Sequence, residues 1–406
     1  MINVAIMGFG TVGSGVYEVI AGNNALLKQR LGDSIQVKKI LDIRNFSGQE
    51  FGSKVVKNFQ DIVEDPEIQI VVETMGGTDP AYRFVSECLQ AGKHVVTSNK
   101  ALVAEYGTGL LKMAREKGVN FFFEGSVGGG IPVIRAMSEA YSGEYIREIT
   151  GILNGTTNFI LTKMEEEGES FQGALKTAQS LGYAENNPAA DVEGHDTCRK
   201  IAILASLATG KEVDFRDIRM EGISGIDQED FLYAKALHSS IKLFGDARFE
   251  EGKLFAYVAP VMVSHDHPLY MVRDVFNGIM IEGNMLGKSM LYGSGAGKLP
   301  TASAMVADII HAAGSLNTSI CKGWSSEKQP VEDILQMSHS YFVRFKGQGG
   351  EAGERCHKAF GGGKYIHLEG REEFGFLTGL MREKDFLSVL KNQEGVLKYI
   401  RSKVAL

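Results

Sequence analysis

A lysine and an aspartate four residues apart stand at the start of a strongly apolar segment. Asp196 and Lys200 come just before residues 201–208, IAILASLA, in which Ser206 is the only polar residue. A spacing of four places both groups on one face of a helix, and apolar side chains continue that face. A desolvated lysine has a depressed pKa unless an acid compensates, and such lysines transfer protons near neutral pH. The pattern therefore predicts either a proton-transfer group or a structural ion pair.

Three more carboxylates precede this pair in residues 182–195, GYAENNPAADVEGH. Glu185, Asp191 and Glu193 could neutralise the ammonium group of an amino-acid substrate. The alternative is a solvated turn, because asparagine and proline are abundant here. Either interpretation places acidic groups directly before the buried helix.

Two other turns carry polar groups that could bind a ligand. In NGTTNF, residues 154–159, Thr156 and Thr157 lie where a strand meets a helix, and a helix N-cap is the simpler interpretation. In EGSVGGGIP, residues 124–132, a turn ends the last strand of the first domain. Its backbone carbonyls could hold a hard cation, and a flexible hinge is the alternative.

A glycine motif of the type GxGxxG lies near the start of the chain. Gly8, Gly10 and Gly13 stand between an apolar strand, 4–7, and a segment with helical spacing of valines. Such glycines allow a tight turn and a close approach of the backbone to a pyrophosphate, which the helix N-terminus then binds. In this position the motif predicts a dinucleotide site.

The second predicted strand, 35–43, carries the residues that could select the cofactor. An acid there usually bonds the ribose hydroxyl of NAD, whereas a nearby arginine accommodates the phosphate of NADP. The sequence offers both, as Asp42 and Arg44, with Lys38 and Lys39 close by. The choice between NAD and NADP therefore stays open.

Strands and helices alternate over the first 124 residues without hairpin signals. Strands at 68–73, 94–97 and 120–124 are separated by helices at 81–91 and 101–117, which predicts an α/β fold with a doubly wound parallel (Rossmann) sheet. Lys100 follows the strand that ends at Thr97, so it lies at the carboxyl edge of the sheet, where ligands of such folds bind. A solvated loop lysine is an equally good interpretation.

The pattern predicts three domains. Residues 1–132 form the NAD(P)-binding Rossmann domain, to which the apolar helix within 300–320 returns. Residues 133–299 form an α+β domain for substrate binding, catalysis and dimerisation. Residues 338–406 form a small α+β module at the C-terminal end, with strands around glycine-rich loops.

Composition narrows the class of partner. The chain has 406 residues, of which 44% are hydrophobic and 23% charged, and its net charge is -7. This balance argues against binding to nucleic acid, which needs an excess of lysine and arginine, and favours small molecules. The four cysteines show neither metal-finger nor disulfide spacing. The apolar start of the sequence lacks a basic leader, and no run reaches the 18 apolar residues of a membrane-spanning helix. We therefore expect a cytoplasmic protein without membrane contact.

Six segments, in order, resemble homoserine dehydrogenases: GFGTVGSGV, TSNKALVA, EGSVGGGIPVI, NGTTNFIL, GYAENNPAADVEGHDTCRKIAILA and YGSGAGKLPTASAMVADI. The resemblance covers about residues 1–320. It implies an NAD- or NADP-dependent enzyme that interconverts L-homoserine and L-aspartate 4-semialdehyde in threonine, methionine and isoleucine biosynthesis. It also implies a homodimer or higher homo-oligomer.

The resemblance assigns roles to individual residues. Lys200, Lys100 and Asp196 would be catalytic, with Lys200 as the proton donor, and the substrate would contact Glu185, Asp191, Asp196 and Thr156. The backbone carbonyls of Glu124, Val127, Gly129 and Ile131 would hold a monovalent cation, Na⁺ or K⁺. Cofactor contacts would come from Gly8, Phe9, Gly10, Thr11, Val12, Gly13, Asp42, Arg44, Gly76, Ser98, Lys100, Gly182, Glu185 and Gly295.

The C-terminal module resembles an ACT-type regulatory domain in SYFVRF and FGFLTGLMREKDFLSVLKN. However, GQGGEAGERCHKAFGGG replaces the turn and the first helix with which such domains bind amino acids. We therefore predict a degenerate module that serves assembly and does not bind threonine.

Two other functions stay open at this stage. The chain could oxidise or reduce another small amino-acid semialdehyde, or it could be a catalytically silent NAD(P) sensor. The intact set of Lys200, Asp196 and Lys100 speaks against the silent sensor.

Overall fold

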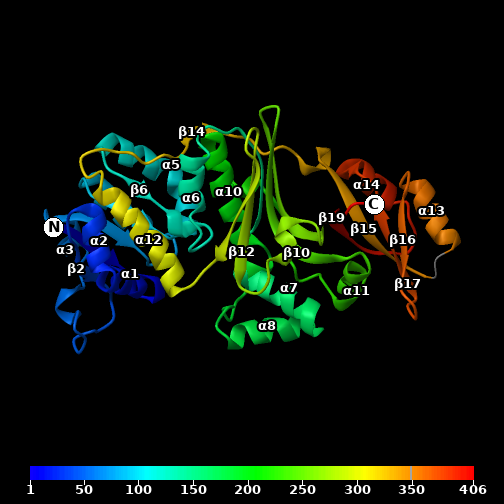
Figure 1. Cartoon of the computed structure of the whole chain (residues 1–406), viewed down its shortest axis with the longest axis horizontal. Coiled ribbons are helices and arrows are strands. Elements are labelled where there is room, and N and C mark those ends of the chain that lie inside the picture. Colours follow the sequence, from blue (N-terminus) through cyan, green and yellow to red (C-terminus); the bar gives the residue numbers. More distant parts are fainter. Residues whose placement is uncertain (348–349) are drawn as a thin grey trace. The chain divides into compact units, whose positions relative to one another are not determined.

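The computed structural model describes residues 1–347 and 350–406 (Figure 1). Gln348 and Gly349, in the glycine-rich stretch of the C-terminal module, lie outside the described residues. The chain divides into two compact units. The first unit comprises residues 1–145, 202–215 and 291–329, and the second comprises 146–201, 216–290 and 330–406.

The first unit is built on a parallel sheet of six strands in the order β3-β2-β1-β4-β5-β6. This confirms the predicted doubly wound sheet. The strands are almost continuously apolar because both faces of a parallel sheet are buried. They are β1 Ile2–Met7, β2 Ile35–Leu41, β3 Val55–Val56, β4 Ile68–Glu73, β5 His94–Thr97 and β6 Phe121–Phe122.

Helices cover this sheet, and one of them comes from far along the chain. Helix α12 lies beside α1 (Figure 1), and its Ala302, Met305 and Ile309 join Val16 and Ile20 of α1 in one buried cluster. The helices of the first unit are α1 Thr11–Gly22, α2 Asn24–Leu31, α3 Gln60–Val63, α4 Ala81–Gln90, α5 Lys100–Lys117, α6 Val133–Arg135 and α12 Lys298–Ala313. A small parallel pair, β8 Lys211–Glu212 and β14 Ser325–Lys328, completes the unit.

The second unit is built on a mixed sheet in the order β13-β12-β7-β10-β11-β19-β15-β17-β16. Its first strands form an antiparallel layer, and β19 joins β11 in parallel. The strands are β7 Ile146–Ile152, β9 Arg219–Met220, β10 Ser239–Glu250, β11 Lys253–Ser264, β12 Phe276–Gly283, β13 Gly287–Ser294, β15 Ser338–Lys346, β16 Gly363–His367, β17 Glu373–Thr378, β18 Met381–Arg382 and β19 Val396–Lys403.

The helices that follow β7 position the candidate site of the second unit. They are α7 Gly155–Glu167, α8 Phe171–Ser180, α9 Ala189–Val192, α10 His195–Thr209 and α11 Gln228–Ala236. The second half of α10, from residue 202 on, belongs to the first unit. Among the residues that the structure describes, no helix has both the length and the apolar character needed to cross a membrane.

The C-terminal segment contains a helix that the sequence analysis expected to be missing. Between β15 and β16 lies α13 Glu351–Ala359, and α14 Glu383–Leu390 precedes β19. The segment is thus a βαββαβ unit with the ferredoxin-like order β19-β15-β17-β16. The expectation was wrong because the buried residues of α13 include Gly353 and Cys356, which give a weak apolar signal. Acidic residues in its first turn and basic residues in its last turn favour the helix.

Candidate active site

The predicted pair at the start of the apolar segment is formed in the second unit. Lys200 Nζ lies 2.7 Å from Asp196 Oδ2 and also donates a hydrogen bond of 2.7 Å to the carbonyl oxygen of Leu153. The side chains are only 9% and 2% exposed, respectively. The ammonium group is therefore held by a carboxylate and a carbonyl in a place largely closed to solvent. Such a group can deliver a proton in a defined direction.

Asn154 brings two aspartates together at this pair. Its Nδ2 donates hydrogen bonds to Asp191 Oδ1 at 2.7 Å and to Asp196 Oδ2 at 2.9 Å. Its Oδ1 accepts a hydrogen bond from the Thr157 backbone at 2.8 Å, so Asn154 is the N-cap of α7. The prediction that Thr156 or Thr157 caps this helix was wrong. Asparagine is a preferred N-cap, and its position directly before Gly155 was the signal that the sequence analysis missed.

Thr156 holds the turn that follows α8. Its hydroxyl donates a hydrogen bond of 2.6 Å to the carbonyl oxygen of Tyr183, and Tyr183 packs edge-on against Phe159. Glu185 is two residues further on, with an exposed side chain. Gly182 in the same turn has a φ of 76°, which glycine adopts without strain. The turn with Gly182 and Glu185 is thus fixed beside the start of α7.

The glycine motif of the first unit adopts the geometry expected of a dinucleotide loop. Gly8 has a φ of 90°, and a Cβ atom on Gly13 would lie 2.1 Å from the Gly8 carbonyl oxygen. Only glycine fits at position 13, because helix α1 packs directly on the turn. Thr11 and Val12 are the first residues of α1, so the open N-terminus of this helix faces the loop.

Asp42 and Arg44 meet at the end of β2. Arg44 Nη2 lies 2.8 Å from Asp42 Oδ2, which also accepts the Phe9 backbone N–H at 2.8 Å. The hydrogen bonds from Arg44 hold the pKa of Asp42 well below its usual range, although burial opposes this. The Arg44 side chain remains 55% exposed. Lys57, which the sequence analysis missed, donates to the carbonyl oxygens of Asp42 and Arg44.

A pocket of the first unit opens between the glycine loop and these charged residues. Its lining combines the loop backbone with cationic and apolar side chains. The lining residues include Gly8, Phe9, Gly10, Asp42, Arg44, Lys57, Phe59, Met75, Pro80 and Phe84. The arrangement suits a ligand that has both a flat apolar part and phosphate groups.

Lys100 is the first residue of α5, at the carboxyl ends of β4 and β5. The N-cap of α5 is Asn99, whose side chain accepts the Leu102 backbone N–H at 3.1 Å and donates to the Gly77 carbonyl at 2.6 Å. The Thr97 hydroxyl donates to the buried carboxylate of Glu73 at 2.6 Å. These bonds fix the segment with Ser98 and Lys100 beside the loop that contains Gly76.

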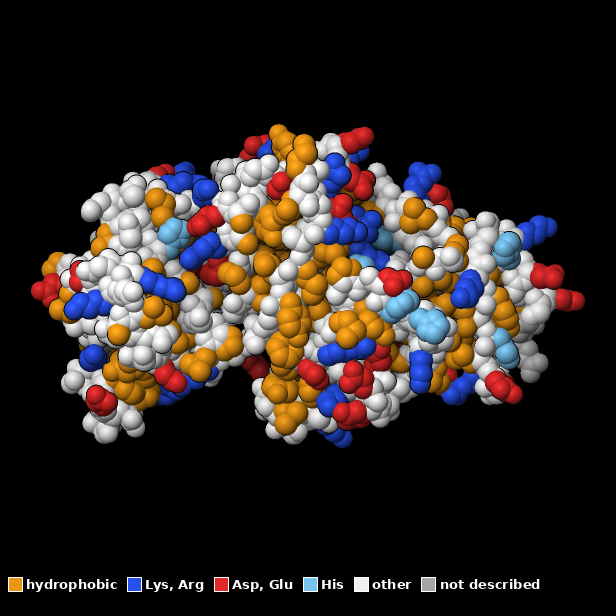
Figure 2. All heavy atoms as spheres, in the orientation of Figure 1, with side chains coloured by type: hydrophobic (Ala, Val, Ile, Leu, Met, Phe, Trp, Pro, Cys, Tyr) orange, Lys and Arg blue, Asp and Glu red, His pale blue; other side chains and the backbone are white. Residues whose placement is uncertain are grey.

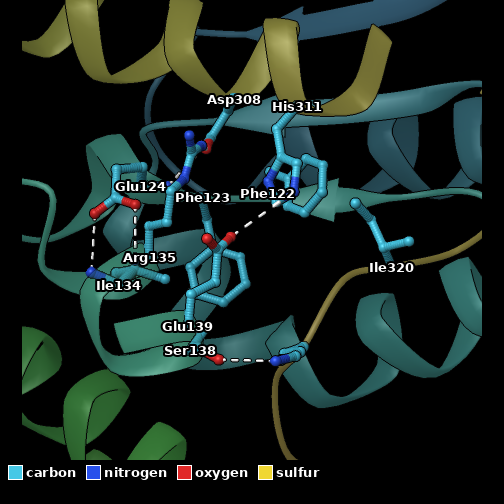
Figure 3. A pocket seen from close by; sticks show the side chains of 11 residues that line it. Phe122, Phe123, Glu124, Ile134, Arg135, Ser138, Glu139, Asp308, His311 and Ile320 are labelled. Atoms are coloured by element: carbon cyan, nitrogen blue, oxygen red, sulfur yellow. Dashed lines mark hydrogen bonds and ion pairs between the residues drawn. The ribbon is translucent and has the colours of Figure 1, made fainter. Parts of the chain in front are cut away.

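The turn at 124–131 is largely buried and is held by hydrogen bonds. Both carboxylate oxygens of Glu124 accept backbone N–H groups, from Ile134 and Arg135, each at 2.8 Å (Figure 3). Asp308 accepts the Glu124 backbone N–H and pairs with Arg135 at 2.6 Å. Burial and the nearby Asp308 raise the pKa of Glu124 to about 7. This network favours an ordered turn over the hinge interpretation.

The groups of this turn that could bind a cation are its backbone carbonyl oxygens. Gly129 has a φ of 57°, and a Cβ atom there would lie 2.5 Å from the carbonyl group of Gly295. The Ile131 carbonyl also accepts the Val133 N–H at 2.8 Å. No cluster of three or more histidine, cysteine, aspartate or glutamate side chains suited to a metal occurs among the described residues.

The predicted residues thus fall into two groups. Lys200, Asp196, Asp191, Thr156 and the turn with Glu185 lie together in the second unit. The glycine loop, Asp42, Arg44, Lys100 and the turn at 124–131 belong to the first unit.

Comparison with known proteins gives consistent matches. Residues 8–124 match the homoserine dehydrogenase NAD-binding domain family, and residues 132–310 match the homoserine dehydrogenase family. Homoserine dehydrogenase of Bacillus subtilis is 40% identical over 312 residues, which are 76% of this chain and 72% of that protein.

Solved structures extend the similarity to the C-terminal segment. A homoserine dehydrogenase from Thiobacillus denitrificans has a TM-score of 0.92 at 33% identity, over 99% of this chain and 98% of that one. A hyperthermophilic archaeal homoserine dehydrogenase in complex with NADPH has a TM-score of 0.65 at 30% identity, over 77% of this chain and 97% of that one.

Proposed function

Because the chain belongs to the homoserine dehydrogenase family, we propose that it interconverts L-homoserine and L-aspartate 4-semialdehyde with a nicotinamide cofactor. The observation that carries this proposal is the buried contact between Lys200 and Asp196. The reaction belongs to the biosynthesis of threonine, methionine and isoleucine, and a cytoplasmic location fits that role.

Lys200 acts as the proton donor in the reducing direction. When bound, the cofactor supplies the hydride that the aldehyde carbon receives. Negative charge then develops on the aldehyde oxygen, and the Lys200 ammonium group gives it a proton. Asp196 keeps the lysine charged, and the Leu153 carbonyl restricts the direction of its remaining N–H bonds. In the oxidising direction the neutral amine takes the hydroxyl proton.

The carboxylates beside Lys200 bind the amino group of the substrate. Asp191 is oriented by Asn154, and the Thr156 hydrogen bond fixes the turn that carries Glu185. Carboxylates oriented in this way are suited to an ammonium group, which donates up to three hydrogen bonds. Lys100 supplies a second cation at the cofactor side, as its match to the family's other catalytic lysine implies.

We propose NADP as the preferred cofactor. Both oxygens of Asp42 are already engaged by Phe9 and Arg44, which disfavours a bond to the ribose hydroxyl of NAD. Arg44 and Lys57 place two cations at the same end of the pocket, where they can meet a ribose phosphate. The remaining implied contacts, Thr11, Val12, Gly76, Ser98, Gly182, Glu185 and Gly295, belong to the same proposal.

The proposal includes a monovalent cation and a homodimer or higher homo-oligomer. The carbonyls of Glu124, Val127, Gly129 and Ile131 would hold Na⁺ or K⁺ and so stiffen the turn. For assembly, hydrophobic side chains gather where β10 and β12 lie on the face shown in Figure 2. In the β12–β13 hairpin, Met285 and Leu286 are exposed. Such a surface is typical of an interface between protein copies.

The test is the oxidation of homoserine, followed by nicotinamide absorbance at alkaline pH with NADP and with NAD. Lys200→Ala should lower kcat by about 10²–10⁴-fold, because general acid catalysis is lost, while cofactor binding measured by calorimetry stays the same. Lys163→Ala is the matched control, since Lys163 forms an i,i+4 pair with Glu167 on α7 of the same unit. Full turnover in Lys200→Ala would exclude the role given to this lysine.

A further inference from the structure

The last strand of the chain carries a buried arginine that two glutamates hold. The Arg401 side chain is only 2% exposed, and it lies in β19. Its Nε and Nη2 donate to Glu383 at 3.0 and 2.6 Å, and its Nη1 and Nη2 donate to Glu221 at 2.8 and 3.0 Å. One guanidinium group thus makes a paired contact with each of two carboxylates. Such contacts are strong and strictly oriented.

Glu221 begins a short segment, residues 221–223, that lies against the C-terminal end of helix α9. The Glu221 backbone N–H is anchored on the Val258 carbonyl at 2.7 Å, and the Ile223 N–H donates to the Val192 carbonyl at 2.8 Å. Between them, a Cβ atom on Gly222 would lie 2.4 Å from the Val192 carbonyl oxygen. The segment therefore packs on this end of α9 with no space left for a side chain at Gly222.

This end of α9 carries the aspartate that we assign to the substrate. Val192 directly follows Asp191, and Asp191 accepts the 2.7 Å hydrogen bond from Asn154. A displacement of residues 221–223 would move Val192, and with it the neighbouring Asp191 carboxylate. From this series of contacts we infer that Arg401 is a positioning residue for Asp191, acting through Glu221. The inference rests on the proposed contact between Asp191 and the substrate.

The contact gives the C-terminal module a part in substrate binding. The Arg401 side chain is fixed from its own segment by Glu383 and reaches Glu221 from there. The module therefore sets the position of residues 221–223 without contributing a group to the chemistry. Changes in the module should then alter the affinity for the amino-acid substrate more than they alter the catalytic rate.

The decisive variant is Glu221→Gln. It weakens the pair with Arg401, while Glu383 still compensates the buried guanidinium charge, so the fold is preserved. Coupling between residues in contact of this kind changes binding by about 3- to 30-fold. We expect KM for homoserine to rise within that range, with kcat changed less than about twofold and KM for the cofactor unchanged.

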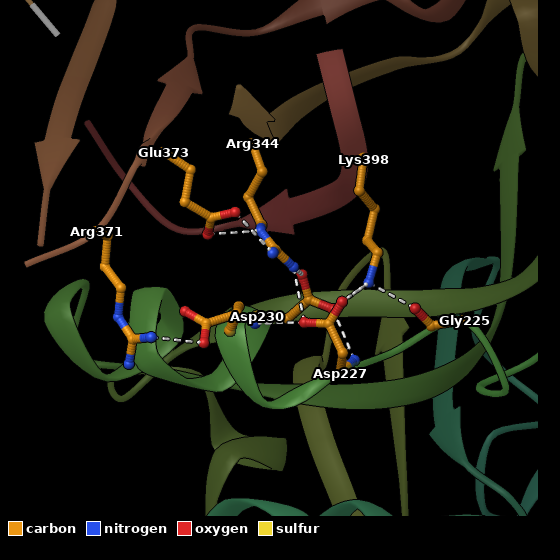
Figure 4. Close-up of polar contacts among 8 residues, drawn as sticks. Gly225, Asp227, Asp230, Arg344, Arg371, Glu373 and Lys398 are labelled. Atoms are coloured by element: carbon orange, nitrogen blue, oxygen red, sulfur yellow. Dashed lines mark hydrogen bonds and ion pairs between the residues drawn. The ribbon is translucent and has the colours of Figure 1, made fainter. Parts of the chain in front are cut away.

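Glu373→Gln is the matched control. Glu373 makes the same kind of paired contact with Arg344, at 3.1 and 3.0 Å, and Arg344 keeps Asp227 and Asp230 as partners when Glu373 is changed (Figure 4). This network attaches the module to the start of α11, and among the described residues no hydrogen bond or ion pair of Arg344 or Glu373 reaches residues 221–223. We expect KM for homoserine to remain at the level of the unchanged protein in Glu373→Gln. Equal increases in both variants would show a general structural effect and would overturn the inference.

Two more variants separate this inference from the proposed function. Gly222→Ala should raise KM for homoserine as Glu221→Gln does, because the added methyl group pushes directly on Val192. Asp191→Asn should also raise KM, and adding Glu221→Gln to it should have no further effect. If Asp191→Asn leaves KM unchanged, the proposed substrate contact is wrong. If it raises KM and Glu221→Gln does not, the positioning role of Arg401 is wrong while the function stands.

Discussion

Lys242 is a buried lysine outside the candidate site. Its burial should destabilise the protein near neutral pH, and this cost should disappear at alkaline pH. It lies in β10 without exposure to solvent, and its Nζ donates a hydrogen bond of 2.7 Å to the Val272 carbonyl. Burial, together with the nearby Arg273, lowers its pKa from 10.5 to about 7, although Glu165, Glu166 and Asp274 oppose this. We predict that Lys242→Met stabilises the protein near neutral pH.

The size of the effect follows from the two pKa values of Lys242. Between pH 10.5 and pH 7 the unfolded chain binds a proton at this lysine that the folded chain does not bind, so the free energy of unfolding rises with pH. The cost to the folded state is about 4 kcal/mol at pH 7, about 2 kcal/mol at pH 9 and close to zero above pH 10.5. The methionine variant lacks this cost. It also lacks the hydrogen bond to Val272, which is worth about 1 kcal/mol at every pH.

Urea unfolding of both proteins between pH 7 and pH 9 measures the effect. The advantage of Lys242→Met should shrink by about 2 kcal/mol over this range. An advantage that is independent of pH, or a loss of stability at pH 7, would refute the reasoning. Lys403→Met is the contrasting control, because Lys403 is 18% exposed and pairs with two carboxylates, Asp246 at 3.0 Å and Glu148 at 2.7 Å. Its loss should cost about 3–5 kcal/mol.

Three further outcomes concern the candidate site. Arg44→Gln should raise KM for NADP by about tenfold or more, because one charge-assisted phosphate contact is lost. KM for NAD should change by less than about threefold, and steady-state kinetics with each cofactor will measure both values. Asn154→Ala should lower kcat/KM for homoserine by about 10-fold or more, because two aspartates lose their donor and α7 loses its N-cap. Its thermal unfolding will separate the two causes. The deaminated analogue 4-hydroxybutanoate should be oxidised with kcat/KM lower by about 10²-fold or more, since the carboxylates of Asp191 and Glu185 then lose the ammonium group that they bind. Equal rates would exclude an ammonium site.

The parts of the fold that the sequence predicted are those with a strong local pattern. The observed bounds lie within a few residues of the expected ones for the apolar strands at 68–73 and 94–97 and for the apolar helix α12. Helix α13 was missed because glycine and cysteine, not large apolar residues, face its core. The pairing of β19 with β11 joins Arg401 to Val261, residues too distant in sequence for any local signal.

The site could be predicted where its residues are neighbours in the sequence. Asp196 and Lys200 are one helical turn apart, so their spacing alone indicated the pair that the structure contains. Asn154 lies 37 and 42 residues from the aspartates that it binds, and Lys57 lies 15 residues from Asp42. Those contacts depend on how strands and helices pack, and spacing carries no information about them.

A neutral amide is the group that holds the two aspartates. Since Asn154 carries no charge, its hydrogen bonds orient Asp191 and Asp196 without supplying a counter-charge. A lysine in its place would compete with the substrate's ammonium group for the same oxygens. An aspartate would cap α7 equally well, but it would repel both carboxylates. The amide at this position is therefore required by the aspartates and not by the helix, which makes Asn154 a part of the site although it is far from both in the sequence.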